Sequence, residues 1–265
     1  MNKRMTAAAM TALALIIPTG CASVHGGVST VAPPSSTART GLHGARSEDE
    51  AAIHTRRLLV KSVGGRAVWL FASGDPDASH RVLVVGCIHG DEPAGIAVVR
   101  ALMSRRPPPE VGLWLVPDLN PDGRALNRRQ NGDQVDLNRN FPYHWRRIGH
   151  PGQLHYSGRR PLSEPESRAA ANLILHVRPT LSIWFHQALA VVDLSGGSAA
   201  IERGFAQLVD LPAARLPRYP GSATGWENHR LRGTTAFVVE LPGGPPSPVL
   251  IHDSANAILA VAARR

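Results

Sequence analysis

Cysteine is scarce in this chain, which has 265 residues and only two cysteines. Two cysteines cannot build the set of disulfide bonds that stabilises many small secreted domains, but a chain of this length can bury a substantial hydrophobic core instead. Cys87 lies inside an apolar run, where we expect it to be a small buried hydrophobic side chain. Cys21 lies near the N-terminus, in a segment of different composition.

Two signatures of other protein classes are also missing. The sequence has no block of lysine and arginine interleaved with aromatic residues, although its formal net charge is +9, so we expect no nucleic-acid partner. The positive charge indicates either an anionic partner or simply a basic surface. The Gly-x-Ser-x-Gly elbow of serine hydrolases is absent as well, and residues 195–198 are more simply a glycine-rich turn.

The N-terminal region has the pattern of a secretory signal. Lys3 and Arg4 precede a short apolar segment, residues 5–17, and small residues follow it up to Cys21. The segment is too short to span a bilayer, so we expect residues 1–21 to be a signal peptide and the protein to be exported, to the periplasm, the cell envelope or the medium.

The residues before Cys21 also resemble a bacterial lipoprotein signal, although Pro18 stands where such signals usually carry leucine. That resemblance implies a lipidated Cys21 and attachment to a membrane. The alternative is ordinary cleavage by signal peptidase without a lipid. The next segment, residues 22–50, is rich in Ser, Thr, Ala, Gly and Pro, and this composition predicts a disordered linker. One folded domain is then expected over residues 51–265.

Four short apolar runs organise this domain. They are nearly continuous in hydrophobicity, which is typical of strands buried on both faces of a sheet, and they cover residues 82–88, 111–116, 181–185 and 235–239. Helical patterns follow at residues 93–104, 164–175, 199–208 and 248–262. Ser163 and Glu166 have the spacing of a capping box at the start of the second helix. The sequence therefore predicts a single α/β domain with a mixed, mostly parallel central sheet covered by helices.

Chemically active side chains stand where these strands end. His89, Asn120, His186 and Glu240 each follow a different run. In open α/β sheets, ligands bind beyond the carboxyl ends of the strands, so we expect these four segments to converge on one site.

A metal centre is the first candidate for that site. His89 and Glu92 stand three residues apart, and His186 ends a later strand. Two histidines and one carboxylate leave a fourth position open, as in catalytic zinc sites, where the metal lowers the pKa of a coordinated water toward about 7. The spacing of His89 and Glu92 alone also fits an ordinary surface turn. Among the remaining histidines, His155 and His229 are further candidates to line the site.

Four more motifs follow in a fixed order along the chain. They are Asn120-Pro121-Asp122-Gly123, Asp136-Leu137-Asn138-Arg139-Asn140-Phe141-Pro142, Ser163-Glu164-Pro165-Glu166 and Phe237-Val238-Val239-Glu240-Leu241-Pro242. With the His89 motif, this series resembles the zinc metallocarboxypeptidase family, and within it the bacterial murein peptide amidases. The resemblance covers about residues 62–262 and implies a zinc carboxypeptidase-like fold.

The resemblance also implies a role for each matching residue. His89, Glu92 and His186 would hold one Zn²⁺ ion. Glu240 would be the catalytic carboxylate, which takes a proton from the attacking water and returns it to the leaving amine. Arg129 would polarise the scissile carbonyl and stabilise the oxyanion.

Asn138 and Arg139 match the pair that receives the terminal carboxylate of the substrate, for which arginine offers a planar fork. An ion pair of Arg139 with Asp136 is the structural alternative. Arg128 adjoins Arg129, so the polarising arginine could be the neighbouring residue. Tyr219 is a poor match to the mobile tyrosine of digestive carboxypeptidases, and its alternative role is packing beside Pro220.

The predicted function is zinc-dependent hydrolysis of an amide bond beside a free carboxylate. Export and the resemblance point to a peptide substrate from the cell wall, such as one with a γ-D-Glu-diaminopimelate bond. Three alternatives stay open. An N-acyl amino acid deacylase and a general C-terminal carboxypeptidase use similar elements, and a non-catalytic wall-binding module would be expected to lack Glu240 or a zinc ligand.

Overall fold

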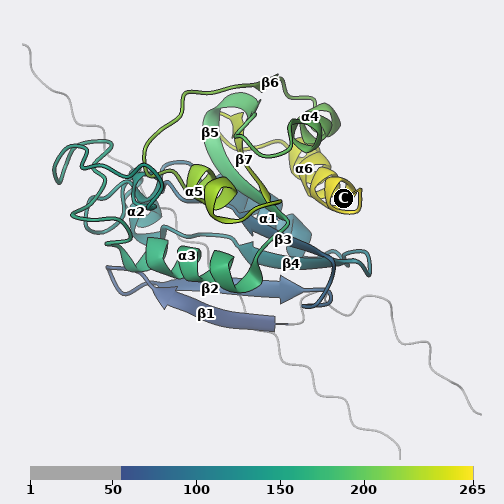
Figure 1. Ribbon diagram of the computed structural model, residues 1–265, viewed down its shortest axis with the longest axis horizontal. Helices are drawn as coiled ribbons and strands as arrows, with labels where there is room; N and C mark the ends of the chain where they lie inside the picture. Colours follow the sequence, from purple (N-terminus) through teal and green to yellow (C-terminus); the bar gives the residue numbers. More distant parts are fainter. Residues whose placement is uncertain (1–54, 265) are drawn as a thin grey trace, which may run out of the picture. The chain divides into compact units, whose positions relative to one another are not determined.

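The computed structural model describes residues 55–264. They form an α/β domain with a seven-stranded mixed sheet and helices on both of its faces (Figure 1). The predicted signal peptide, Cys21 and the linker over residues 22–50 lie outside the described residues. Within the described range, no helix is long and apolar enough to cross a bilayer.

The sheet has the strand order β1-β2-β4-β3-β5-β6, and β7 pairs with β5. β1 pairs antiparallel with β2, and β2 pairs antiparallel with β4, whereas β3, β4, β5, β6 and β7 pair in parallel. The strands are β1 (Thr55–Lys61), β2 (Ala67–Ser73), β3 (His80–Val85), β4 (Val111–Val116), β5 (Leu181–Asp193), β6 (Ala213–Ala214) and β7 (Thr235–Pro242). The prediction of a mixed, mostly parallel sheet is confirmed.

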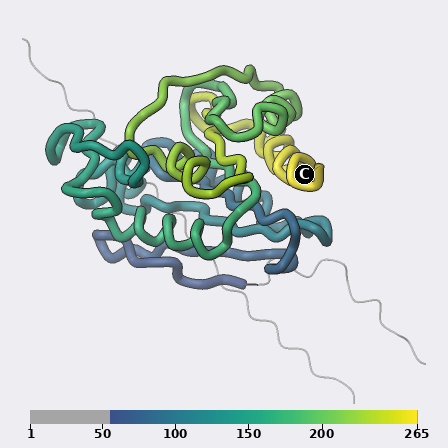
Figure 2. Tube along the Cα trace, in the orientation of Figure 1, coloured from purple at the N-terminus to yellow at the C-terminus, as the bar shows by residue number. Residues whose placement is uncertain are grey.

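Helices cover both faces of the sheet, which explains the continuous apolar runs. Successive strand side chains point to opposite faces, so Val82 and Val84 pack into one core while Leu83 and Val85 pack into the other. The first core includes α1 (Gly95–Met103), α4 (Ala199–Leu208) and α6 (Pro248–Ala262). The second core includes α3 (Pro165–Val177) and α5 (Ala223–Arg230), which lie on the near side of the sheet in Figures 1 and 2.

Two short helical segments, α2 (Pro121–Ala125) and η1 (Leu137–Arg139), belong to the loops beside the site. Cys87 is fully buried, as predicted, and its Sγ lies 3.0 Å from the carbonyl oxygen of His89. The helices at 199–208 and 248–262 also agree with the prediction.

The predicted capping box at Ser163 is wrong. α3 begins at Pro165, and no side chain caps its first turn. Ser163 Oγ instead donates to Glu164 Oε1 at 2.6 Å, while Glu166 Oε1 accepts the backbone N–H of Val63 at 3.1 Å. Ser163 Oγ also accepts the Asn140 Nδ2–H at 3.0 Å, so partners distant in sequence engage both side chains, and Pro165 removes one of the backbone N–H groups that a cap would satisfy.

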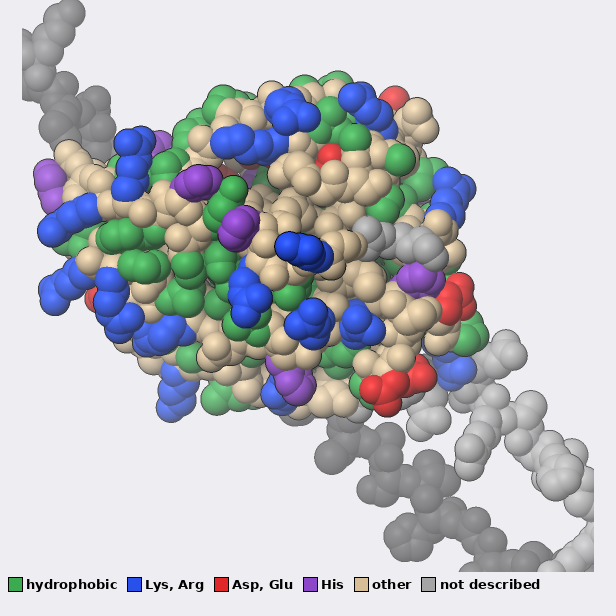
Figure 3. Space-filling view, in the orientation of Figure 1, with side chains coloured by type: hydrophobic (Ala, Val, Ile, Leu, Met, Phe, Trp, Pro, Cys, Tyr) green, Lys and Arg blue, Asp and Glu red, His purple; other side chains and the backbone are tan. Residues whose placement is uncertain are grey.

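Two further features of the fold were not predicted. β1 and β2 form an antiparallel hairpin at the edge of the sheet, and most of β1 is exposed, so its sequence carries no clear burial pattern. β5 continues beyond His186 to Asp193 as a long curved strand (Figure 1). On the face shown in Figure 3, lysine and arginine side chains are spread over the surface rather than gathered in one block.

Candidate active site

Three parallel strands bring side chains to one cavity. β3 leads to His89, β5 carries His186, and β7 carries Glu240, which pairs in register with His186. The cavity has a volume of about 300 Å³, and all three side chains line it. The expected convergence is confirmed for these three segments, whereas Asn120, the fourth, does not line the cavity.

Asn120 lies behind the cavity, where its side chain fixes the surrounding backbone. Its Nδ2 donates to the carbonyl oxygens of Ile88 (3.1 Å) and Arg129 (3.0 Å), and its Oδ1 accepts the N–H of Gly123 (2.9 Å). The backbones at Gly90 and Gly123 touch, and a Cβ on Gly90 would lie 1.9 Å from the Gly123 carbonyl carbon. The loops that carry the His89 and Asn120 motifs therefore require glycine where they pack together.

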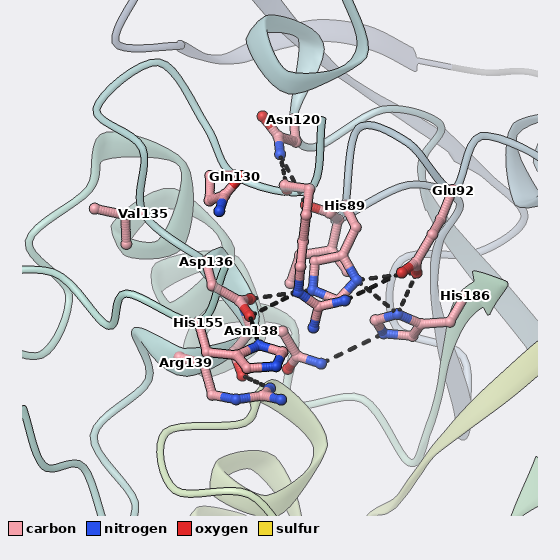
Figure 4. A network of polar contacts seen from close by, with 12 residues as sticks. His89, Glu92, Asn120, Gln130, Val135, Asp136, Asn138, Arg139, His155 and His186 are labelled. Carbon is pink, nitrogen blue, oxygen red and sulfur yellow. Dashed lines mark hydrogen bonds and ion pairs between the residues drawn. The ribbon is translucent and has the colours of Figure 1, made fainter. Parts of the chain in front are cut away.

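His89, Glu92 and His186 form a compact group of potential metal ligands (Figure 4). Glu92 Oε2 lies 2.9 Å from His89 Nδ1 and 2.8 Å from His186 Nδ1, and the two ring nitrogens are 3.0 Å apart. One ligand atom from each side chain lies within 4.8 Å of the other two. Two imidazoles and one carboxylate facing one point match the ligand set of a catalytic zinc site with one open position.

Asp136 holds His89 from behind. Its Oδ1 lies 3.1 Å from His89 Nε2, so this contact favours the tautomer that carries its proton on Nε2 and leaves Nδ1 free for a metal. Asp136 also accepts the Asn138 N–H at 3.0 Å and the Arg129 Nε–H at 2.8 Å. Burial acts to raise the pKa of Asp136, but His89, His155 and Arg129 lower it well below its usual value. The buried carboxylate therefore stays ionised.

The surroundings shift the pKa of each of the three potential ligands. Burial acts to raise the pKa of Glu92, but His89 and His186 outweigh burial and lower it. Burial lowers the pKa of His186, so its ring is neutral near pH 7. Burial and Arg129 act to lower the pKa of His89, but Asp136 and Glu92 outweigh them and raise it.

Glu240 has the environment of a group that exchanges protons near neutral pH. Burial and the nearby charge of Glu92 raise the pKa of Glu240 to about 7. Its Oε2 is buried and has no hydrogen-bond partner among residues 55–264. A carboxyl group with a pKa close to the ambient pH and a free oxygen can act as a general base and then as a general acid.

Arg129 lines the cavity, whereas Arg128 points away from it. Arg129 Nη1 donates to Glu92 Oε1 at 3.2 Å, and its Nε donates to Asp136. Arg128 Nη2 donates to the carbonyl oxygens of Asn131 (2.5 Å) and Gly132 (3.2 Å). The geometry therefore favours Arg129 over its neighbour as the arginine that faces a substrate.

Arg139 is a buried cation without an acidic partner. Its Nη1 donates to the Asn138 carbonyl oxygen at 2.8 Å, and no ion pair joins Arg139 to another residue in the described range. The structural alternative, an ion pair with Asp136, is not formed because Arg129 and the histidines occupy that carboxylate. Burial lowers the pKa of Arg139, which reflects the cost of a desolvated cation that a substrate carboxylate would offset.

Three remaining candidates have different outcomes. Tyr219 lines the cavity, half exposed, and its ring centre lies 4.2 Å from Arg139 Cζ. His155 also lines it and places Nδ1 3.3 Å from Asp136 Oδ2. His229 lies in an adjoining hollow, where its ring stacks on Tyr143 at 4.1 Å, and does not line the cavity of the metal group.

Two charged residues in the lining were not predicted. Asp193 ends β5, and Arg218 comes from the segment before α5. The sequence does contain a signal for Asp193, because Val191-Val192 is another apolar pair that ends in a carboxylate. Arg218 has no comparable signal, since nothing in the local pattern distinguishes it from the other scattered arginines.

Comparison with known proteins places the chain in one family. Residues 49–203 match the zinc carboxypeptidase family, in a segment that ends before Arg218 and Glu240. Murein peptide amidase A of Vibrio campbellii is 31% identical over 212 residues, which cover 74% of this chain and 83% of the relative. The Escherichia coli K12 protein of the same name is 30% identical over 62% of this chain and 72% of its own length.

Solved structures agree with the sequence matches. The murein-tripeptide amidase of Escherichia coli O157 superposes with a TM-score of 0.63 at 26% identity and covers 83% of this chain and 94% of its own. Carboxypeptidase A of Helicoverpa armigera has a TM-score of 0.65 at 19% identity, over 80% of this chain and 68% of its own, and this likeness shows the fold alone.

Proposed function

The chain belongs to the zinc carboxypeptidase family, and from that premise we propose that it hydrolyses an amide bond beside a free carboxylate in cell-wall (murein) peptides. The family and the His-Glu-His group make it a zinc-dependent hydrolase. The narrower proposal is supported by the named activity of its relatives and by one observation in the cavity. The metal group, a carboxyl oxygen and an arginine that have no hydrogen-bond donor and no acidic partner, respectively, among residues 55–264 all face the same space.

The proposed roles follow from the positions of the side chains. His89, Glu92 and His186 would hold the zinc ion, which, when bound, polarises a carbonyl and lowers the pKa of a coordinated water. Glu240 takes a proton from the attacking water and later delivers it to the leaving amine, because its pKa lies near neutral pH.

Two arginines would act on different parts of the substrate. Arg129 has its Nη1 near Glu92 and would stabilise negative charge that develops on the scissile carbonyl oxygen. Arg139 and Asn138 would bind the terminal carboxylate and set the scissile bond beside the metal group. Tyr219 would cover the bound residue from above Arg139.

Hydrolysis of L-Ala-γ-D-Glu-diaminopimelate by the purified protein tests this proposal directly. We expect release of diaminopimelate that stops when a chelator removes the metal and resumes when zinc is restored. N-acyl amino acids and ordinary C-terminal peptides are the parallel substrates, since a deacylase or a general carboxypeptidase would prefer them. Cleavage of those substrates with the wall peptide left intact would overturn the proposed substrate and keep the zinc site.

The proposal includes export of the protein, because murein lies outside the cytoplasmic membrane. The leader of residues 1–21 and the linker to residue 50 support it through their composition. Cell fractionation and the mass of the mature N-terminus test it, and a diacylglyceryl modification on Cys21 would identify a lipoprotein. Retention of an uncleaved leader in the cytoplasm would contradict it.

A further inference from the structure

Asp193 and Arg218 form an ion pair in the wall of the active-site cavity. Arg218 Nη1 donates to Asp193 Oδ2 at 2.6 Å, and its Nη2 donates to the carbonyl oxygen of Leu194. Asp193 is buried and fully engaged, because its Oδ1 accepts the Leu216 N–H at 2.9 Å and its Oδ2 also accepts Ser195 Oγ–H at 2.6 Å. The carboxylate therefore works as an anchor that fixes the direction of the guanidinium.

The pair is tied to the strand that carries Glu240. Ser195 Oγ accepts the backbone N–H of Val238 at 3.2 Å, and Val238 lines the same cavity. Residues two apart in a strand face the same side at a separation of roughly 7 Å, so Val238 and Glu240 point into the cavity together. Ser195 therefore links the Asp193–Arg218 pair to the strand that carries the predicted base, and the pair and Glu240 line the same cavity.

Arg218 keeps donors available for a ligand. A guanidinium has five N–H groups, of which the two bonds to Asp193 and Leu194 use two. No other partner of Arg218 occurs among the described residues, and 45% of its side chain is exposed, in a cavity that also contains Arg139. A fixed, half-exposed fork with free donors is suited to a planar carboxylate and loses little freedom when it binds one.

We propose that Arg218 binds a second carboxylate of the substrate, on the side chain of the residue whose terminal carboxylate Arg139 receives. The substrate class is then a peptide that ends in a diamino dicarboxylic acid. This inference rests on the proposed function and adds the residue that distinguishes such a peptide from one that ends in lysine. Arg218 acts in specificity and touches no reacting atom.

A matched pair of substrates measures the contribution of the second carboxylate alone. L-Ala-γ-D-Glu-diaminopimelate and L-Ala-γ-D-Glu-L-Lys differ only in the carboxylate at the far end of the side chain. The measured quantity is the ratio of their kcat/KM values, which cancels any loss that both substrates share. The variants are Arg218→Met, Arg218→Lys and, as a matched control, Arg215→Met, since Arg215 is exposed three residues earlier and lies outside the cavity lining.

We expect wild-type protein and Arg215→Met to favour the diaminopimelate substrate by the same factor, and Arg218→Met to reduce that factor at least tenfold. Arg218→Lys keeps a charge beside Asp193 and should give an intermediate ratio, even if Arg218→Met proves unstable. An unchanged ratio in both Arg218 variants would overturn the inference and leave the proposed function standing. Failure of wild-type protein to cleave either peptide would overturn the proposed function, and the inference with it.

Discussion

The two ends of the active-site cavity are built in different ways. At the metal end, His89 follows β3, while His186 and Glu240 lie within β5 and β7, and the histidines are almost completely buried, with 1% exposure for His89 and 4% for His186. The arginine end stands on η1 and on the segment before α5. Its Arg139 is buried at 4% exposure, but Tyr219 and the Arg218 side chain are 51% and 45% exposed. The strands and the loop after β3 hold the groups for chemistry, while η1 and the segment before α5 present the groups that select the substrate.

The difference predicts that changes at the metal end affect turnover and changes at the arginine end affect substrate binding. Glu240→Gln should have the largest effect, a loss of about 10³-fold in kcat, because the amide cannot take and return the proton. Zinc content, measured by metal analysis, should stay at the wild-type level. A variant that retained most of its kcat would remove Glu240 from the catalytic role.

Arg139→Met should act at the other end of the cavity. We expect kcat/KM to fall by about 10²-fold, mainly through KM, because the substrate carboxylate loses a buried charged partner. A substrate with an amidated C-terminus supplies the control, since it lacks the carboxylate. The variant should reduce kcat/KM for this amide much less than for the free acid. Equal losses for the two substrates would show that Arg139 acts on the structure and not on the carboxylate.

Asp136→Asn tests the support of the metal end without changing a ligand. Replacing the carboxylate behind His89 should weaken zinc binding by about 10- to 100-fold, because the amide no longer orients the ring and stabilises its N–H. Competition with a chromogenic chelator measures that affinity. Zinc binding as tight as in the wild type would contradict the role assigned to Asp136.

The smallest expected effect is that of Glu227, which lies on α5 and does not line the cavity. This fully buried carboxyl on α5 bonds to Ser182 and Trp184 of β5, and burial raises its pKa to about 7. Because the folded pKa is raised, the protein favours the protonated form. Stability contributed by this group is complete below about pH 4.5, the unfolded value, and is lost as the pH rises through 7.

Glu227→Gln keeps a neutral group in the same place and should remove that part of the pH dependence. Between pH 5 and pH 8, we expect the wild type to lose on the order of 2–3 kcal/mol more stability than the variant. Urea denaturation of the two proteins at both pH values measures the difference. Parallel curves would show that Glu227 is ionised at pH 8 without cost.

The metal end was predictable from the sequence, and much of the arginine end was not. His89, His186 and Glu240 each follow an apolar run, so their positions beside buried strands are visible in the sequence, although β5 and β7 continue past His186 and Glu240. The choice between Arg128 and Arg129 needed the structure, because both side chains leave the same loop and only their partners differ. The predicted capping box is not formed, because Asn140 and Val63, which are distant in sequence, bond to the side chains of Ser163 and Glu166.

The zinc ligand set was identified through the resemblance of the motifs to a known family, and the sequence by itself determined the α/β class and the order of the strands that lead to the site. Local patterns suffice for these features, because continuous burial and strand ends leave a signature in neighbouring residues. The tertiary structure alone decided that β5 continues to Asp193 and that Arg218 points into the cavity beside it. A contact between residues 25 positions apart depends on how the chain returns to the sheet, and no local pattern encodes that path.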